Sequence, residues 1–228
     1  MSAWPHIAFA PHIAFAVVLG LSAGAGVMLS RRARANARLY MQFAASLYVA
    51  FAIANGIAAV EGGVIAGFFA GGLGLFVSAL APLALVLGVA SAQFSPLRTL
   101  PATIILLLGL CAALAAVATA APALAFVPLF VAACAMAVMA SRLWVRNRRA
   151  ALNLIVSACS LVAGAAAFMS GGAEGRTAMG LFAAAALLGV ATILGERAKK
   201  RLHKRAEPTP GTDLRSAMAE RLVIRRGR

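Results

Sequence analysis

The chain has 228 residues, of which 63% are hydrophobic and 12% charged, and its formal net charge is +15. Soluble domains are about half apolar and about a quarter charged, so this composition excludes an ordinary soluble domain. The apolar runs are continuous and about twenty residues long, which favours helices over the alternating segments of about ten residues in a β-barrel. We predict an all-α integral membrane protein.

Seven transmembrane helices are predicted from these runs. Their residues are 13–29, 39–60, 64–92, 101–120, 124–140, 151–169 and 178–195. The third contains Pro82, which we expect to kink one long helix, because proline lacks a backbone donor and clashes with the preceding turn. Dividing the third run at Pro82 would leave a second half too short to cross the bilayer.

Two arginine-rich stretches, residues 30–38 and 141–149, predict the orientation. With the N-terminus outside and the C-terminus inside, 20 of the 21 Lys and Arg residues lie on one side, and only Arg176 lies on the other. Positive residues in short flanking loops are held on the cytoplasmic side. We therefore expect a multi-pass protein of the cell membrane, specifically a bacterial inner membrane. Contacts with anionic lipid headgroups are expected from Arg31, Arg32, Arg142, Arg146, Arg149, Lys199 and Lys200.

The sequence divides into a transmembrane domain, residues 1–195, and a basic cytoplasmic tail, residues 196–228, with eleven basic and four acidic residues. Residues 196–205 extend the last helix into the headgroup region. Beyond a Pro/Gly-rich break at 208–211, an apolar face could lie on the membrane or on a partner, while a disordered tail is an equal alternative. This face consists of Leu214, Ala217, Met218 and Leu222. At its Pro, Gly, Arg and Ala positions, segment 207–218 resembles the opening of a diguanylate cyclase domain, which adds some weight to a sensor-type module.

A parallel internal repeat is a further hypothesis. Placing Arg31 on Arg142 superimposes the two arginine stretches and pairs Ser30 with Ser141. The same shift pairs Gln42 with Asn153 and Ser46 with Ser157, so each copy carries an amide followed one turn later by a hydroxyl. Two triplets joined by a fourth helix would have the same orientation. This plan resembles that of the three-plus-one-plus-three sugar transporters. Their Pro-Gln signature is absent, so the resemblance assigns no residues or substrate.

Polar residues inside the spans are the candidates for a substrate path, because polar groups in hydrocarbon are costly unless they have partners. The path candidates are Gln42, Ser46, Asn55, Asn153 and Ser157, and Tyr48, Ser78 and Ser160 are also intramembrane polar residues. The alternative is hydrogen bonding between helices, worth about 0.6 kcal/mol per bond on average. Glycine ridges at Gly63/Gly67/Gly71 and at Gly20/Gly24 would allow close packing against an internal helix or a protein partner.

No complete catalytic or metal-binding pattern occurs in the sequence, so we expect neither enzymatic activity nor a metal or other cofactor. The last span has no lysine to form a retinal Schiff base. We expect Cys111, Cys134 and Cys159 to be small buried hydrophobic side chains. The positive charge has no accompanying motif that reads nucleic acid, so anionic lipids are the expected partners rather than nucleic acid.

Two functions remain open from the sequence. The first is a non-enzymatic membrane module, either a sensor and anchor or an accessory subunit of a membrane complex that binds through the glycine ridge or the tail. The alternative is a small-solute transporter built on the parallel three-helix repeat. The first is favoured, because a path for polar solutes generally needs more than a few amides and hydroxyls.

Overall fold

The computed structural model describes residues 5–31, 33, 35–61, 64–93, 99–119, 121, 123–170 and 172–206. These residues form seven helices and no strand. The helices are α1 (Pro5–Ser30), α2 (Ala35–Glu61), α3 (Val64–Gln93), α4 (Thr99–Ala118), α5 (Ala123–Trp144), α6 (Arg148–Met169) and α7 (Gly172–Ala206). The apolar face predicted at 214–222 and the segment resembling a cyclase opening lie outside the described residues.

Six of the helices, α2 to α7, each contain a stretch long and apolar enough to cross a membrane. The part of α1 with described side chains, Phe15–Ser30, is also apolar but shorter. Six such helices indicate a multi-pass membrane protein. Helix α3 continues through Pro82 as one helix. Proline also lies inside α5, at Pro128.

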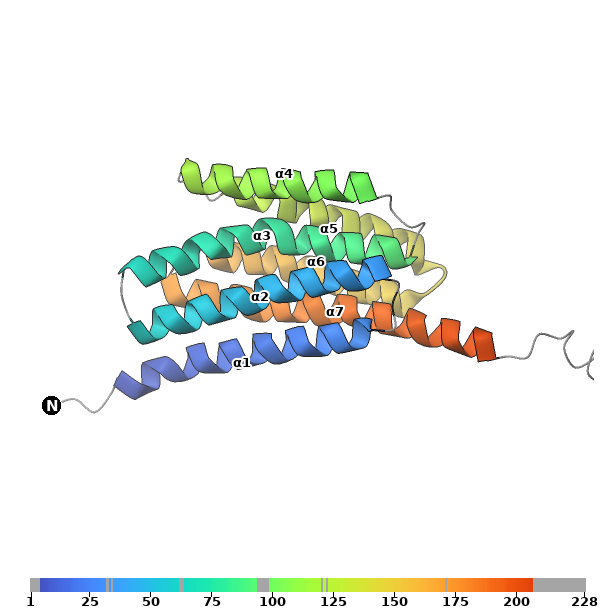
Figure 1. Cartoon of the computed structure of the whole chain (residues 1–228), viewed down its shortest axis with the longest axis horizontal. Coiled ribbons are helices and arrows are strands. Elements are labelled where there is room, and N and C mark those ends of the chain that lie inside the picture. Colours follow the sequence, from blue (N-terminus) through green and yellow to red (C-terminus); the bar gives the residue numbers. More distant parts are fainter. Residues whose placement is uncertain are drawn as a thin grey trace, which may run out of the picture.

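The helices lie side by side in a bundle, and six of them form a closed ring of neighbours in the order α1, α2, α3, α5, α6, α7 (Figure 1). Helices α3 and α7 also touch each other across this ring. Helix α4 packs outside it against α3 and α5, at the upper edge of the view. The C-terminal part of α7 extends past the ends of the other helices.

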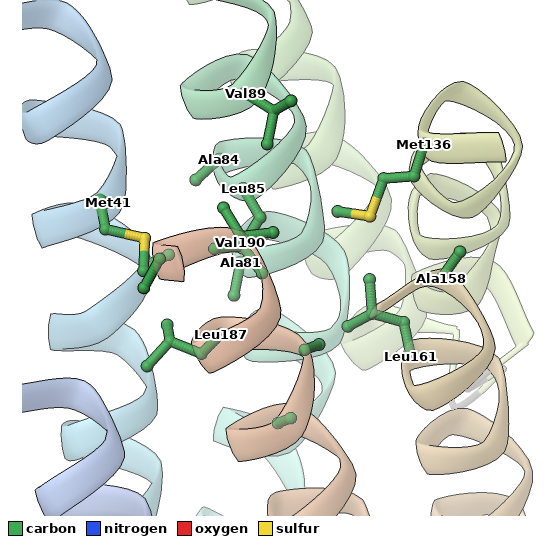
Figure 2. Packing of buried hydrophobic residues seen from close by; sticks show 14 of the residues in the cluster. Met41, Ala81, Ala84, Leu85, Val89, Met136, Ala158, Leu161, Leu187 and Val190 are labelled. Carbon is green, nitrogen blue, oxygen red and sulfur yellow. The ribbon is translucent and has the colours of Figure 1, made fainter. Parts of the chain in front are cut away.

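Many small side chains are buried where the helices meet, and large apolar side chains are common on the outer surface of the bundle. On α2, Ala37, Ala44 and Ala45 are buried, whereas Leu39, Phe43 and Ile53 are exposed. Lipid is as apolar as leucine, so helices associate through close packing, which small residues permit. Larger side chains such as Met41, Leu85, Met136, Leu161 and Leu187 fill the centre between the helices (Figure 2).

The three cysteines correct one sequence expectation. Cys111, Cys134 and Cys159 are free and exposed on the outer surfaces of α4, α5 and α6. The expectation of burial was wrong because it assumed that apolar residues in a span face protein. A thiol behaves as a small hydrophobic group, and such a group can face lipid as readily as protein.

The buried faces of α2 and α6 correspond when Ala37 is placed on Ala150. The α2 residues are Ala37, Met41, Ala44, Ala45, Tyr48, Phe51 and Ala52, and their buried α6 counterparts are Ala150, Leu154, Ser157, Ala158, Leu161, Gly164 and Ala165. The first residues of the two helices, Ala35 and Arg148, coincide in the same alignment.

The shift predicted from the arginine stretches, which places Arg31 on Arg142, instead puts this buried face of α2 on the outward face of α6. Met41 is fully buried, for example, whereas Leu152, its counterpart under that shift, is 49% exposed. The two alignments differ by a slip of two positions, which rotates a helix face by about 200°, because successive residues are about 100° apart. The similar arginine stretches therefore do not give the alignment in which the helices correspond.

Asn147 explains why α6 begins within its arginine stretch. The side-chain Oδ1 of Asn147 accepts a hydrogen bond from the backbone N–H of Ala150 at 3.3 Å. This is the N-cap interaction, which satisfies a backbone donor that has no partner within the helix. Asn36, which the match of the arginine stretches pairs with Asn147, lies inside the first turn of α2 instead.

Candidate functional site

Asn55 and Arg176 form a polar contact between α2 and the first part of α7. Asn55 is 5% exposed, and its Nδ2 donates to the backbone oxygen of Phe51 at 2.8 Å. Its Oδ1 accepts a hydrogen bond from Nε of Arg176 at 3.2 Å. Both ends of the buried amide therefore have partners, and one partner is a charged guanidinium. Such charge-assisted hydrogen bonds are among the stronger ones in proteins.

A second polar cluster joins α6 to α7. Nδ2 of Asn153 donates to Oγ1 of Thr192 at 3.0 Å. Oγ of Ser157 lies 2.7 Å from the backbone oxygen of Asn153 and 3.2 Å from that of Ala186. A Cβ atom at Gly189 would overlap Oγ of Ser157, so glycine allows this close approach. These contacts tie the two helices together.

Gln42 and Ser46 lie elsewhere, on the outward face of α2, and both are exposed. Oγ of Ser46 donates to the backbone oxygen of Phe43 in its own helix at 2.8 Å. The five path candidates therefore occupy three separate places, namely the Asn55–Arg176 contact, the α6–α7 cluster and the outer face of α2. The pairing of Gln42 and Ser46 with Asn153 and Ser157 does not give them equivalent surroundings.

The centre of the bundle contains a cavity of about 10 Å³, lined in part by Tyr48, Ser78 and Ser160. Oγ of Ser78 lies 2.7 Å from the backbone oxygen of Gly74 and 3.8 Å from Sδ of Met179. A cavity of about this size is at the lower limit for holding one water molecule. The remaining lining is mainly apolar, so this cavity is a packing defect between helices with three hydroxyl groups at its edge.

A larger depression lies on the outer surface, between α1 and α2, and we call it the α1–α2 groove. One part has a volume of about 720 Å³ and the other about 450 Å³, and they share Gly20, Val49 and Ile53. The larger part is lined by Gly20, Ala23, Gly24, Val27, Met28, Arg31, Gln42, Ala45, Ser46, Val49, Ala50 and Ile53. The smaller adds Ala16, Ala52, Gly56 and Ile57.

Glycine residues give the α1–α2 groove its depth. A Cβ atom placed on Gly20, Gly24 or Gly56 would meet no other atom within 4 Å. The end of the groove near the turn between α1 and α2 is polar, because Arg31 and Gln42 line it there. An open apolar groove with a guanidinium and an amide at one end can accommodate an elongated amphipathic molecule.

The structure describes most of the residues that were predicted to contact lipid headgroups. Arg31, Arg142, Arg146 and Arg149 are exposed, as headgroup contact requires. Lys199 and Lys200 lie on the extension of α7, and Arg32 lies outside the described residues. Of the predicted glycine ridge on α3, Gly71 has open space around its Cβ position, and Gly63 is outside the described residues.

The sequence did not indicate the partner of Asn55. Arg176 falls between the predicted sixth and seventh spans, but α7 begins at Gly172 and includes it. The usable signal was its isolation as the single basic residue on the side that was predicted to be external.

Comparisons with protein-family models, with curated proteins and with solved structures give no match. The fold itself, with six helices long and apolar enough to cross a membrane, defines the class of this chain as a multi-pass helical membrane protein.

Proposed function

We propose that this chain is a non-enzymatic membrane module, either a sensor and anchor or an accessory subunit of a membrane complex. The observation that supports this role is the location of its large depression, which faces outward between α1 and α2. The described cavity at the centre is about 10 Å³. A surface of this kind suits binding along the outside of the bundle rather than passage through it.

The proposed topology has seven crossings, with the N-terminus outside and the C-terminus in the cytoplasm. Support for the first crossing comes from α1, whose 26 residues correspond to about 39 Å at helical rise, more than the hydrocarbon thickness of about 30 Å. The segregation of 20 of 21 basic residues supports the orientation. A bacterial inner membrane is the proposed location.

The proposal retains a parallel three-plus-one-plus-three plan, with the alignment corrected so that Ala37 falls on Ala150. Its support is the matching burial of α2 and α6 and the order of neighbours around the ring. Exchanging α1–α3 for α5–α7 maps this ring onto itself and leaves α4 outside. This plan describes the arrangement of the helices and does not by itself indicate a specific function.

The transporter alternative draws no support from the placement of the path candidates. Asn55 and Asn153 bond to different partners on α7, and Gln42 lies on the outer face of α2. A shared path would require these side chains to line one continuous polar cavity. The hydrogen bonds of Asn55 and Asn153 to α7 join neighbouring helices. A bond of this kind contributes about 0.6 kcal/mol on average.

Co-purification tests the proposed role. The tagged full chain is extracted from its own membrane in mild detergent and analysed by native mass spectrometry. We expect a second protein at a fixed ratio. A lone monomer, with unchanged helix content, would contradict the proposal.

A matched pair of tail variants locates the contact. Leu214→Asp with Leu222→Asp changes the predicted apolar face, and Thr209→Asp with Thr212→Asp adds the same charge elsewhere in the tail. If the tail binds the partner, only the first pair releases it. Release by neither pair would place the contact on the transmembrane domain.

A further inference from the structure

The two ends of the α1–α2 groove differ in chemistry. Arg31 and Gln42 line one end, beside the arginine-rich turn that connects α1 and α2. From there the lining is almost entirely apolar as far as Ala16 on α1 and Ile57 on α2. A molecule that matches this pattern has an anionic head and an extended hydrocarbon chain.

The larger part of the groove is about as long as the hydrocarbon half of one lipid leaflet is thick. The larger part runs from Gly20 to Arg31, eleven residue steps or about 17 Å at helical rise. Half of a hydrocarbon core of about 30 Å is about 15 Å. The smaller part adds about 6 Å, as far as Ala16. The whole groove is therefore shorter than the length of about 30 Å that a membrane-crossing helix packed along it would need.

We propose that the α1–α2 groove binds one anionic phospholipid. The phosphate lies at Arg31 and Gln42, and an acyl chain lies over Gly20 and Gly24. Arginine pairs well with phosphate because its planar guanidinium offers several donors in a fixed geometry. Basic sites between transmembrane helices on the cytoplasmic side are typical positions for anionic headgroups. The open space at the glycine Cβ positions provides room for the chain.

Helix α7 passes beside the same end of α1. Leu29 of α1 lies next to Gly195 of α7, with the Leu29 backbone oxygen 3.6 Å from a Cβ placed on Gly195. Beyond this contact α7 continues to Ala206 and carries Arg197, Lys199, Lys200, Arg201, Lys204 and Arg205. The guanidinium of Arg31, which lines the groove itself, favours an anionic headgroup over a zwitterionic one. This inference depends on membrane insertion and not on the proposed protein partner.

Native mass spectrometry of the full chain tests the proposal, with dioleoyl phosphatidylglycerol or dioleoyl phosphatidylcholine added in equal amounts. We expect one phosphatidylglycerol molecule to be retained in preference to phosphatidylcholine. Arg31→Gln should weaken phosphatidylglycerol retention about fivefold, the effect of one basic residue near an anionic headgroup. Arg148→Gln, at an exposed position in the other arginine stretch, is the matched control and should retain the lipid as the unmodified chain does.

Filling the groove gives a second, independent variant. Gly24→Leu should reduce retention by at least about tenfold, because its side chain displaces several methylenes of the acyl chain. Gly72→Leu on α3, where a Cβ also meets nothing within 4 Å, is the control and should have no effect. If Gly24→Leu does not fold, Arg31→Gln decides the question alone.

Three results would overturn the proposal. The first is equal retention of the two lipids by the unmodified chain, and the second is unchanged retention in Arg31→Gln or in a folded Gly24→Leu variant. The third is a dimer or a bound protein that Gly24→Leu releases, since the groove would then be a protein interface. Failure to find a protein partner would leave the lipid result intact, so the two proposals fail separately.

Discussion

Nε of Arg176 donates to Oδ1 of Asn55 at 3.2 Å and so links α7 to α2, although the two residues are 121 positions apart in the sequence. Arg176 is also the one basic residue that the proposed topology leaves outside. Its side chain lies partly buried against the bundle. The bond to Asn55 thus gives a structural role to Arg176, the basic residue that the segregation of positive charge does not explain.

This contact predicts energetic coupling between the two residues. Asn55→Ala removes the acceptor of Arg176, and we expect each of Asn55→Ala and Arg176→Gln to lower stability. The double variant should cost less than the sum, with a coupling of about 1 kcal/mol, near the middle of the range for such bonds in membrane proteins. Unfolding in mixed detergent micelles measures all four proteins. Strict additivity would contradict a direct bond.

The close approach of α6 and α7 predicts that Gly189→Ala is destabilising. Its new methyl group would overlap Oγ of Ser157 and lie 3.2 Å from the backbone oxygen of Asn153. Overpacking of this kind costs about 1–3 kcal/mol. Gly20→Ala, which meets no atom within 4 Å, is the control.

A second substitution identifies the atom responsible. Adding Ser157→Ala to Gly189→Ala removes the overlapping oxygen and should recover part of the lost stability in the same unfolding measurement. Equal stability of Gly189→Ala and Gly20→Ala would contradict the close approach of α6 and α7.

The N-cap of α6 predicts a difference between the two asparagines of the arginine stretches. Asn147→Ala should lower stability by about 1 kcal/mol, whereas Asn147→Asp should preserve the cap because a carboxylate also accepts the bond. Asn36→Ala, inside the first turn of α2, should have a smaller effect. Thermal unfolding followed by circular dichroism measures the three variants. Equal losses in Asn147→Ala and Asn36→Ala would contradict the cap.

The positions of the helices were predictable, but the faces that they bury were not. Continuous apolar runs place six spans within α2 to α7, apart from the C-terminal end of the predicted fourth span, because length and hydropathy are read directly from the sequence. The helix faces have little polarity contrast, since both lipid and the bundle interior accept apolar groups. The repeat predicted from the arginine match shows the consequence, because it places the buried Met41 on the exposed Leu152 rather than on the buried Leu154.

The candidate site was predictable only in part. Asn55 stands out as a polar residue deep in a span, and the structure gives it the partners Phe51 and Arg176. Gln42 and Ser46 stand out equally, yet they lie on the outer face. Sequence identifies the costly polar groups, but their partners depend on helix rotation, which is a property of packing.

The proposed orientation of the chain in the membrane is tested with dual cytoplasmic and periplasmic reporters fused after Arg38, Arg98, Arg149 and Lys200. Seven crossings with the N-terminus outside should give a cytoplasmic signal from all four fusions and an external signal from fusions after Glu61 and Ser170. An external signal from any of the first four would contradict seven crossings with the C-terminus in the cytoplasm.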